Sequence, residues 1–444
     1  MDVYLRDYGI KPNTGEVVHV KIQKAIDDCF LSGGGKIILE DGLYITGGLR
    51  LRSGCTLYLK SGAILKGTRN MEDYKILEKE ALETVNDDYK TDVLWTPAHT
   101  RTTNDHIVKA ASSWNNAIIR ILDAHDVAVI GEYGSVIDGS DPYDPTGEEH
   151  YRGPHGISYH YSKNLRFEGY TIKNTGNWAH LGYKSQNIEY KNIEVLGGHD
   201  GIHNSSCDDF NIEDCAFYTG DDCVAGFDNY NVTVKNCILN SACSGMRFGG
   251  RDVLVDGCRF FGPAKYFFRG SLSLEDKIAG NPSPKSGRTN MLALFTYYSD
   301  FTLDVRKMPG NIVIKNCTVE NCDRFLHFDF TGTHVWQKNK PLTGITFENI
   351  EAKGIGMPFN AYGDRENPLT LVLKNCGIEF TDTTDCAIRS GNFALIKVED
   401  SVFEGVDGAL VKCYGEQGAI ETCGVVGVAR ICDVTDEAFV SKSI

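Results

Sequence analysis

The sequence predicts an all-β protein, built as a right-handed parallel β-helix in which the short strands of successive coils stack on one another. Three observations point to this fold class. Short strand-like segments recur at steps of 21 to 23 residues, they alternate β-branched or aromatic residues with polar ones, and glycine (47) far outnumbers proline (12). Such a period is typical of solenoids, whose coils are stable only when stacked. We therefore expect a single domain over residues 1–444, with about ten or more coils.

The repeat can be followed along most of the chain. Its clearest copies are NLRFEGYTI at 164, NIEYKNIEV at 187, DFNIEDCAF at 209, NVTVKNCIL at 231 and DVLVDGCRF at 252. It resumes at 311, 344, 371, 396 and 419. A leucine-rich repeat has a similar period but needs leucine at fixed positions. The recurring core residues here are Ile, Val and Phe, which favours the β-helix.

Residues 17–31 are the predicted helix of this otherwise β-rich chain. Val18, Ile22 and Ile26 follow helical spacing, and the SGGG sequence at 32–35 ends the helix. Short strand-like runs, KIILE and GLYIT, follow directly. The end of a β-stack exposes unpaired backbone groups, so we expect this helix to cap the N-terminal end.

Three segments interrupt the period: residues 70–115, 271–300 and 331–343. The first is polar and charged and has no strand period. Long insertions in compact proteins tend to be functional. We interpret all three as walls of a cleft.

Two sets of residues recur with the repeat, each at its own position in the coil. They are Cys215, Cys237 and Cys258, and the corner residues Asn236, Asn316 and Asn375. A cysteine cluster can bind metal, but small buried side chains stacked inside the coils explain the spacing more simply. Asparagine at the corners suits hydrogen bonding to turn backbone.

Composition excludes several classes of function. The formal net charge of −15 argues against a nucleic-acid-binding surface, which is basic, and no apolar run approaches the roughly 18 residues that span a membrane. The start, MDVYLRDYGI, lacks the pattern of a signal peptide, and the 15 cysteines lack disulfide spacing. We expect a cytoplasmic protein with free thiols, or a secreted one whose signal was removed. Nothing indicates a cofactor.

The stretch from 200 to 247 holds the candidate chemistry. Trp178, Asp200, Asp222 and Ser244 are 22 residues apart in turn, and Asp221 precedes Asp222. Coils stack about 4.8 Å apart, so the three carboxylates are expected within about 5–10 Å of one another. Paired carboxyl groups at such separations hydrolyse glycosidic bonds, one as acid and one to activate water. The alternative for each motif, HDG and GDD, is a polar turn that has no catalytic role.

A second register follows along the same strands. Ile202, Val224 and Met246 are apolar and should point inward. The alternate set, His203, Ala225, Arg247 and Arg269, should face solvent. Arginine binds carboxylate, sulfate or phosphate through its planar fork, so Arg247 and Arg269 are candidate substrate-binding residues, with edge ion pairs as the alternative.

At these residues the chain resembles the polygalacturonase family, glycoside hydrolase family 28, over nearly its whole length. The opening is similar in DYGI, IQKAIDDCF and GGGKIILEDGLYITGG, and YTIKNTGNW at 170–178 resembles the family's strand ending in N-S-P-x-W. GHDG at 198–201 corresponds to N-T-D-G, and GDDC at 220–223 to G-D-D-C. The resemblance implies a parallel β-helix that inverts the anomeric centre, with Asp221 as general acid and Asp200 and Asp222 holding the attacking water.

The chain departs from the family pattern where the family recognises its substrate. Gly198-His199 replaces Asn-Thr, Cys243-Ser244-Gly245 replaces the G-H-G that supplies a supporting histidine, and no R-I-K is present. The acids are retained while recognition has changed. Besides Arg247 and Arg269, we expect Ser244 at the substrate.

Histidine and aromatic side chains complete the expected site. His199 and His203 flank Asp200 and are expected to bond carboxylates or sugar hydroxyls; metal ligation is the alternative. Trp178, Trp336 and the Tyr297-Tyr298 pair could stack on sugar rings or pack in the core. We assign no metal.

The expected function is an inverting, exo-acting glycoside hydrolase of plant-polysaccharide oligosaccharides, including those that contain uronate. Two alternatives remain open. One is a lyase, epimerase or intramolecular glycosyl transferase on the same fold. The other is a glycan-binding β-helix without catalysis, which the missing supporting histidine favours.

Overall fold

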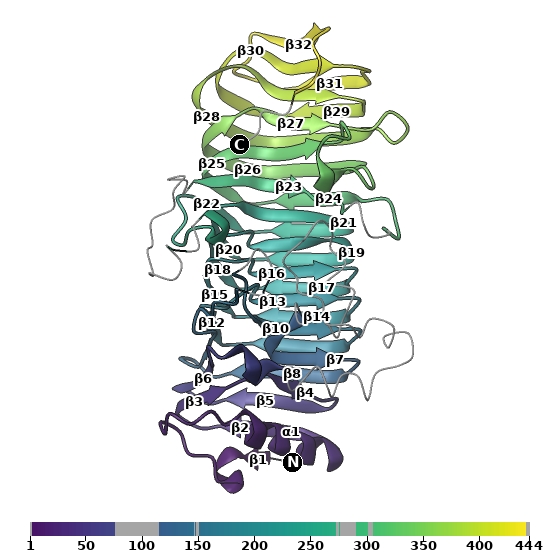
Figure 1. Cartoon of the computed structure of the whole chain (residues 1–444). Coiled ribbons are helices and arrows are strands. Elements are labelled where there is room, and N and C mark those ends of the chain that lie inside the picture. Colours follow the sequence, from purple (N-terminus) through teal and green to yellow (C-terminus); the bar gives the residue numbers. More distant parts are fainter. Residues whose placement is uncertain are drawn as a thin grey trace. The chain divides into compact units, whose positions relative to one another are not determined.

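The computed structural model of the protein describes residues 2–75, 115–145, 147, 151–271, 275, 290–300 and 305–440. The chain divides into two compact units. The first comprises Met1–Ala216 with Arg269–Lys285, and the second Phe217–Phe268 with Ser286–Ile444. Each is a right-handed parallel β-helix (Figure 1). None of the helices in the described ranges has the length and apolarity that a membrane crossing needs.

Three ladders of parallel strands form the first unit. One contains β4 (Leu49–Leu51), β7 (Ala117–Leu122), β10 (His155–His160), β13 (His180–Tyr183) and β16 (Ile202–Ser205). The next contains β1 (Asp2–Tyr4), β2 (Gly35–Leu39), β5 (Cys55–Leu59), β8 (His125–Gly131), β11 (Lys163–Glu168), β14 (Gln186–Lys191) and β17 (Asp208–Glu213). The last contains β3 (Gly42–Thr46), β6 (Ala63–Gly67), β9 (Val136–Asp138), β12 (Thr171–Lys173) and β15 (Glu194–Gly197).

The register of these ladders matches the predicted repeat. Leu165 pairs with Ile188, and Ile188 pairs with Phe210 on the following coil. All three side chains are buried, and each contributes about 1.5–3 kcal/mol by leaving water. The repeat is therefore a stack of core residues, as predicted.

The α-helix α1 (His19–Leu31) lies between β1 and β2 in the chain, close to the predicted 17–31. It follows the short 3₁₀-helix η1 (Leu5–Tyr8) and packs on β2 and β4 through its apolar side (Figure 1). Ile22 and Ile26 are fully buried. The helix thus covers one end of the β-stack of this unit, as predicted.

The second unit continues the same kind of coil with longer strands. They are β18 (Ala216–Thr219), β19 (Val224–Lys235), β20 (Ile238–Ser241), β21 (Ser244–Asp256), β22 (Arg259–Phe261), β23 (Met291–Tyr297), β24 (Gly310–Lys315), β25 (Thr318–Asp329), β26 (Gly344–Met357), β27 (Phe359–Tyr362), β28 (Leu369–Gly391), β29 (Phe393–Glu399), β30 (Val402–Tyr414), β31 (Ala419–Cys423) and β32 (Arg430–Thr435). β18 begins at the last residue of the first unit.

The three predicted insertions differ in how well the structure matches them. Most of 70–115 lies outside the described residues, apart from the 3₁₀-helix η2 (Met71–Tyr74) and Asn115. The boundary of 271–300 is wrong, because its last part forms β23, which pairs with β21 and β25. MLALFTY is a nearly continuous apolar run, and six of its seven residues are buried in the strand that it forms. Segment 331–343 does interrupt the coils, between β25 and β26, and carries the 3₁₀-helix η7 (Val335–Gln337).

The asparagine and cysteine sets are structural, as predicted, but the asparagines bond side chains of neighbouring coils and not the turn backbone that was expected. Asn349 Nδ2 donates to Asn316 Oδ1 at 3.0 Å, and Asn375 Nδ2 donates to Asn349 Oδ1 at 2.8 Å. Their backbones have φ between 51° and 54°, a left-handed conformation that asparagine tolerates. The Cys237 N–H points at Cys258 Sγ, at 3.4 Å. All 15 cysteines are free thiols.

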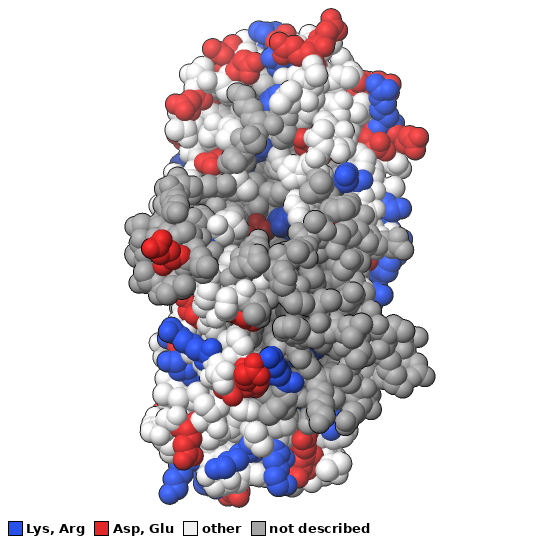
Figure 2. Space-filling model, viewed as in Figure 1, with Lys and Arg blue, Asp and Glu red and all other residues white. Residues whose placement is uncertain are grey.

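Acidic and basic residues are interspersed on the face drawn in Figure 2. Among the described residues of that face, blue and red side chains alternate rather than gather into one large patch of a single sign.

Candidate active site

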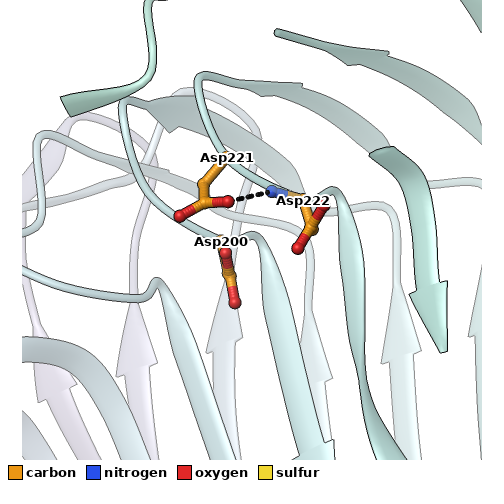
Figure 3. A group of neighbouring side chains, drawn as sticks. All are labelled: Asp200, Asp221 and Asp222. Carbon is orange, nitrogen blue, oxygen red and sulfur yellow. Dashed lines mark hydrogen bonds between the residues drawn. The ribbon is translucent and has the colours of Figure 1, made fainter. Parts of the chain in front are cut away.

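Asp200 lies in the first unit, on the segment between β15 and β16, and is labelled in Figure 3. Its carboxylate is almost completely buried. The Nδ1–H of His203 donates to Asp200 Oδ2 at 2.8 Å. This contact between two buried side chains holds the carboxyl group of Asp200 in one orientation.

The expectation that His203 faces solvent is wrong. Its side chain is 1% exposed, because the indole of Trp178 lies flat against it, with ring centroids 3.7 Å apart and planes 2° from parallel. Trp178 is itself buried. The face of Trp178 that touches His203 is therefore occupied by protein, and Trp178 supports the Asp200 partner rather than presenting that face to a sugar.

His199 is also buried, on the other side of Asp200 in the sequence. Its ring stacks on Tyr151 at 6.1 Å, and its Nδ1 lies 3.3 Å from Arg152 Nη1. The same Arg152 atom donates to Asn177 Oδ1 at 3.0 Å. Sequence reasoning missed Arg152, because residues 139–153 are outside the repeat and no spacing relates them to the acids.

Arg269 is not on the ladder that the sequence predicted. It belongs to the short 3₁₀-helix η6 (Arg269–Ser271) of the first unit, where its Nη2 lies 2.9 Å from Asp141 Oδ1 and its N–H donates to the oxygen of Gly198 at 3.2 Å. On the ladder, Arg247 is followed by Thr296. The 22-residue step ends after β22, so it could not be extended to Arg269.

Asp221 and Asp222 occupy the turn between β18 and β19 of the second unit (Figure 3). The Asp222 N–H donates to Asp221 Oδ1 at 3.0 Å, shown dashed. The main-chain oxygen of Asp221 accepts from Thr219 Oγ1 at 2.6 Å and from Ser241 Oγ at 2.5 Å. A Cβ on Gly220 would lie 1.9 Å from the Phe267 oxygen. This turn is therefore rigid and admits only glycine there.

Asp222 is the buried member of this pair. Burial, followed by the negative charge of Asp221, raises the pKa of Asp222 to about 7, against the opposing effects of Arg247 and Ser244. The Ser244 N–H donates to Asp222 Oδ1 at 2.9 Å. Neighbouring carboxyl groups titrate as a pair, so the two aspartates together hold one proton up to near neutral pH.

Asp222→Asn is expected to stabilise the fold at neutral pH. The folded-state pKa of Asp222 lies above that of an unfolded aspartate, so between about pH 4 and pH 7 the folded chain binds the additional proton and rising pH lowers the free energy of unfolding. An asparagine at position 222 does not titrate, so the free energy of unfolding of the variant does not fall for this reason as the pH rises. The gain should be absent at pH 4 and on the order of 2 kcal/mol at pH 8. Urea unfolding at both pH values measures it, with the exposed Asp407→Asn as control. An equal gain at both pH values would contradict the argument.

Arg247 is held beside Asp222 by aromatic rings. Its Nη1 lies 3.8 Å from Asp222 Oδ2, and the guanidinium lies over Tyr298 at 4.1 Å and over Trp336 at 5.4 Å. The Arg247 side chain is 26% exposed. Cation–π contacts of this kind fix a guanidinium without removing its charge. Of the two roles left open for Tyr298 and Trp336, the structure shows packing: Tyr298 belongs to a core cluster against which Trp336 packs, and both rings lie at Arg247.

The remaining predicted residues lie in the second unit, apart from Ile202, which lies in the first. Ser244 is buried, and its Oγ lies 2.9 Å from Thr296 Oγ1; it contacts Asp222 through its backbone. Tyr297 is fully buried and donates to the Lys340 oxygen at 2.5 Å, so it is a core residue. Ile202, Val224 and Met246 all point inward, as predicted.

Asp200, Asp221 and Asp222 carry oxygen ligands of the kind that could hold a metal ion. Ca²⁺ and Mg²⁺ prefer such carboxylates. A cation would compete with the His203 N–H at Asp200 and with the Arg247 guanidinium at Asp222. We assign no metal to these residues.

Part of the chain, including these segments, is similar to known proteins. Residues 90–249 match the family described as Glycosyl hydrolases family 28. A "Probable polygalacturonase" of Vitis vinifera is 26% identical over 212 residues, which is 45% of this chain and 39% of that protein. The match thus spans well under half of the relative's length.

Solved structures show the same fold. A hyperthermoactive exopolygalacturonase from Thermotoga maritima has a TM-score of 0.60 at 16% identity, covering 91% of this chain and 92% of that one. PfbA, a surface adhesin of Streptococcus pneumoniae, has a TM-score of 0.55 at 13% identity, covering 98% and 91%. These likenesses concern the fold alone.

Residues 90–249 of this β-helix are thus similar to glycosyl hydrolases family 28, and Asp200, Asp221 and Asp222 lie inside the matched residues. A match of 45% of the chain to the probable polygalacturonase of Vitis vinifera points to the same family.

Proposed function

We propose that the protein is a glycoside hydrolase that cleaves pectin-derived, uronate-containing oligosaccharides with inversion and from the chain end. The observation that carries this proposal is the rigid Asp221–Asp222 turn, where two adjacent carboxyl groups share a proton up to near neutral pH. Such a pair can supply an acid at the pH where most enzymes work. The family-28 match at this turn supports glycosides as the substrate class.

Asp200 is proposed to act with this pair. In the first unit, His180 pairs with Ile202, which follows it by 22 residues. In the second unit, Val224 pairs with Met246, again 22 residues later. Ile202 and Val224 are also 22 residues apart, and Asp200 and Asp222 each precede them by two. The same step therefore supports equivalent positions for Asp200 and Asp222 on successive coils.

The proposed reaction uses each carboxyl group once. Asp221 donates its proton to the glycosidic oxygen as the bond to the anomeric carbon breaks. Water attacks that carbon from the opposite face and loses a proton to the carboxylates of Asp200 and Asp222. We assign the donor role to Asp221, although the pKa of Asp222 is the one raised, because Asp222 is 2% exposed and the two titrate together.

Arg247 and His203 are proposed as supporting groups. The guanidinium of Arg247 suits a sugar carboxylate, which can accept two parallel hydrogen bonds from it. His203 is proposed as a positioning residue that holds the Asp200 carboxyl group in place through its 2.8 Å contact with Oδ2. The missing G-H-G histidine is thus partly offset by a histidine that acts on a different aspartate.

Product analysis tests the proposed reaction. The protein is incubated with polygalacturonate oligomers and with neutral galactan oligomers, and products are followed by chromatography, reducing-end assay and anomer-resolved NMR. We expect monosaccharide release from the acidic chains with inverted configuration. Ultraviolet absorbance from a new C=C bond would instead indicate a lyase. Tight binding without turnover of either substrate would indicate a glycan-binding β-helix.

A further inference from the structure

The second unit contains a cavity of about 240 Å³ that the mechanism does not use. It is lined by Arg324, Met357, Pro358, Asn360, Thr384, Asp385, Arg389, Lys412, Tyr414 and Glu437. This volume is below the ~300–1,000 Å³ of a drug-sized pocket. The cavity therefore suits a ligand about the size of one sugar.

The cavity lies on the ladder that carries Arg247. In order, the paired residues of this ladder are Arg247, Thr296, His327, Asn360, Arg389 and Lys412. Arg389 is four rungs from Arg247, or about 19 Å at 4.8 Å per rung. Side chains of one such register leave the same face of a parallel stack, so an extended chain lying along this face can meet both arginines.

Three cations and two carboxylates line the cavity. Lys412 Nζ is paired with Asp385 at 3.1 Å and with Glu437 at 3.8 Å, so these three groups carry a net charge of −1, and the two arginines make the lining positive as a whole. Arg389 contacts neutral groups, namely the Tyr414 hydroxyl at 3.3 Å and the Val440 oxygen at 3.1 Å. Within the described part of the chain, no carboxylate reaches ion-pair distance of Arg389.

Arg324 brings a second positive charge to the same cavity. It is 1% exposed, and its Nη1 lies 2.7 Å from His327 Nδ1, while its Nη2 lies 3.4 Å from Met357 Sδ. Burial and the nearby charge of Arg389 lower the pKa of Arg324 to about 10, so it remains a cation at neutral pH. An anion placed between two guanidinium groups would reduce their mutual repulsion.

We propose that this cavity binds the carboxylate of an acidic sugar, with Arg324 and Arg389 on the carboxylate and Asn360 on a neighbouring hydroxyl. Guanidinium groups match the planar carboxylate. Tyr414, Met357 and Pro358 supply the apolar surface that a sugar ring covers. The carboxylate follows from the charges of the cavity, whereas the choice of a sugar as its carrier rests on the proposed function.

This binding site deepens the proposed function by predicting substrate length. A uronate bound at Arg389 and a bond cleaved near Asp222 belong to one chain only if that chain spans at least the four rungs from Arg247 to Arg389. Short acidic oligosaccharides would use the Arg247 end alone. Longer ones would gain affinity from the cavity, because the second contact becomes intramolecular.

Calorimetric titration of the full chain with galacturonate tests the site without any need for turnover. Galactose is the neutral matched probe and inorganic sulfate the non-sugar anion. Arg389→Met should weaken galacturonate binding about 10- to 100-fold. Arg247→Met should leave the cavity binding in place, as should Arg259→Met, an exposed arginine paired with Glu320. Thermal unfolding of each variant checks that it is folded.

Each outcome decides the matter. Equal binding of galactose, or unchanged galacturonate binding by Arg389→Met, would overturn the carboxylate site. Sulfate binding as tightly as galacturonate would overturn the assignment to a sugar. If calorimetry supports the site while no substrate is hydrolysed, the proposed function fails and the binding site stands. With active enzyme, Arg389→Met should raise KM for long acidic chains and leave KM for short ones unchanged.

Discussion

Replacing Asp221 by asparagine is expected to lower kcat by about 10²–10⁴-fold, the usual contribution of a general acid or base. Asparagine keeps the shape of the side chain and can still accept from the Asp222 N–H, so the turn should persist. It cannot donate a proton to the leaving oxygen. Steady-state hydrolysis of acidic oligosaccharides measures the effect, and it should appear in kcat more than in KM.

The matched control is Asp407→Asn, an exposed aspartate of β30 that should keep full activity. A substrate with an activated leaving group, such as a nitrophenyl glycoside, gives a second check, because it needs little protonation. The Asp221→Asn variant should recover much of its rate on that substrate. If both substrates lost activity equally, Asp221 would not be the acid, and the raised pKa of Asp222 would make Asp222 the next candidate.

Arg247→Met is expected to reduce kcat/KM for uronate-containing substrates by about 10- to 100-fold, the cost of losing a charge-assisted hydrogen bond. Methionine retains part of the packing against Tyr298 and Trp336 but removes the charge. Neutral oligosaccharides of the same length should lose little. Comparison of kcat/KM on the two substrate series measures the carboxylate contribution.

Arg247→Lys separates charge from geometry at the same position. Lysine keeps the positive charge but cannot form two parallel bonds to a carboxylate, so its activity should lie between those of arginine and methionine. An equal loss on acidic and neutral substrates for Arg247→Met would show that Arg247 acts on Asp222, which lies 3.8 Å away, and not on the substrate.

Much of the scaffold could be predicted because the repeat carries its own register. Leu165, Ile188 and Phe210 are equivalent positions in the sequence and stacked partners in the structure. The asparagines at 316 and 375 occupy corners for the same reason. The turn acids were predictable because glycine flanks them and the step of 22 residues relates them.

Other parts of the site depend on tertiary contacts, which the 22-residue repeat of the sequence does not predict. His203 was expected outside, since alternation alone decides the side of a strand from which a residue leaves, and the covering indole of Trp178 is a tertiary contact. Arg269 was misplaced because the coil length changes after β22. The cavity residues were missed, since successive coils place Thr296, His327, Asn360 and Arg389 at unequal intervals along the chain.

After β22 the chain leaves the coil and then returns as β23, which pairs with β21. This arrangement affects how the scaffold could be altered. Arg247 and Thr296 are neighbours on adjacent strands although 49 residues separate them. Strand pairing, and not the length of the intervening segment, sets their spacing. Segments of other lengths between β22 and β23 are therefore compatible with the spacing of the ladder, provided that Phe267 stays beside Gly220 and Arg269 keeps its contact with Asp141. Transplanting loops into this scaffold would vary the surroundings of the proposed site while Asp200, Asp221 and Asp222 stay in place.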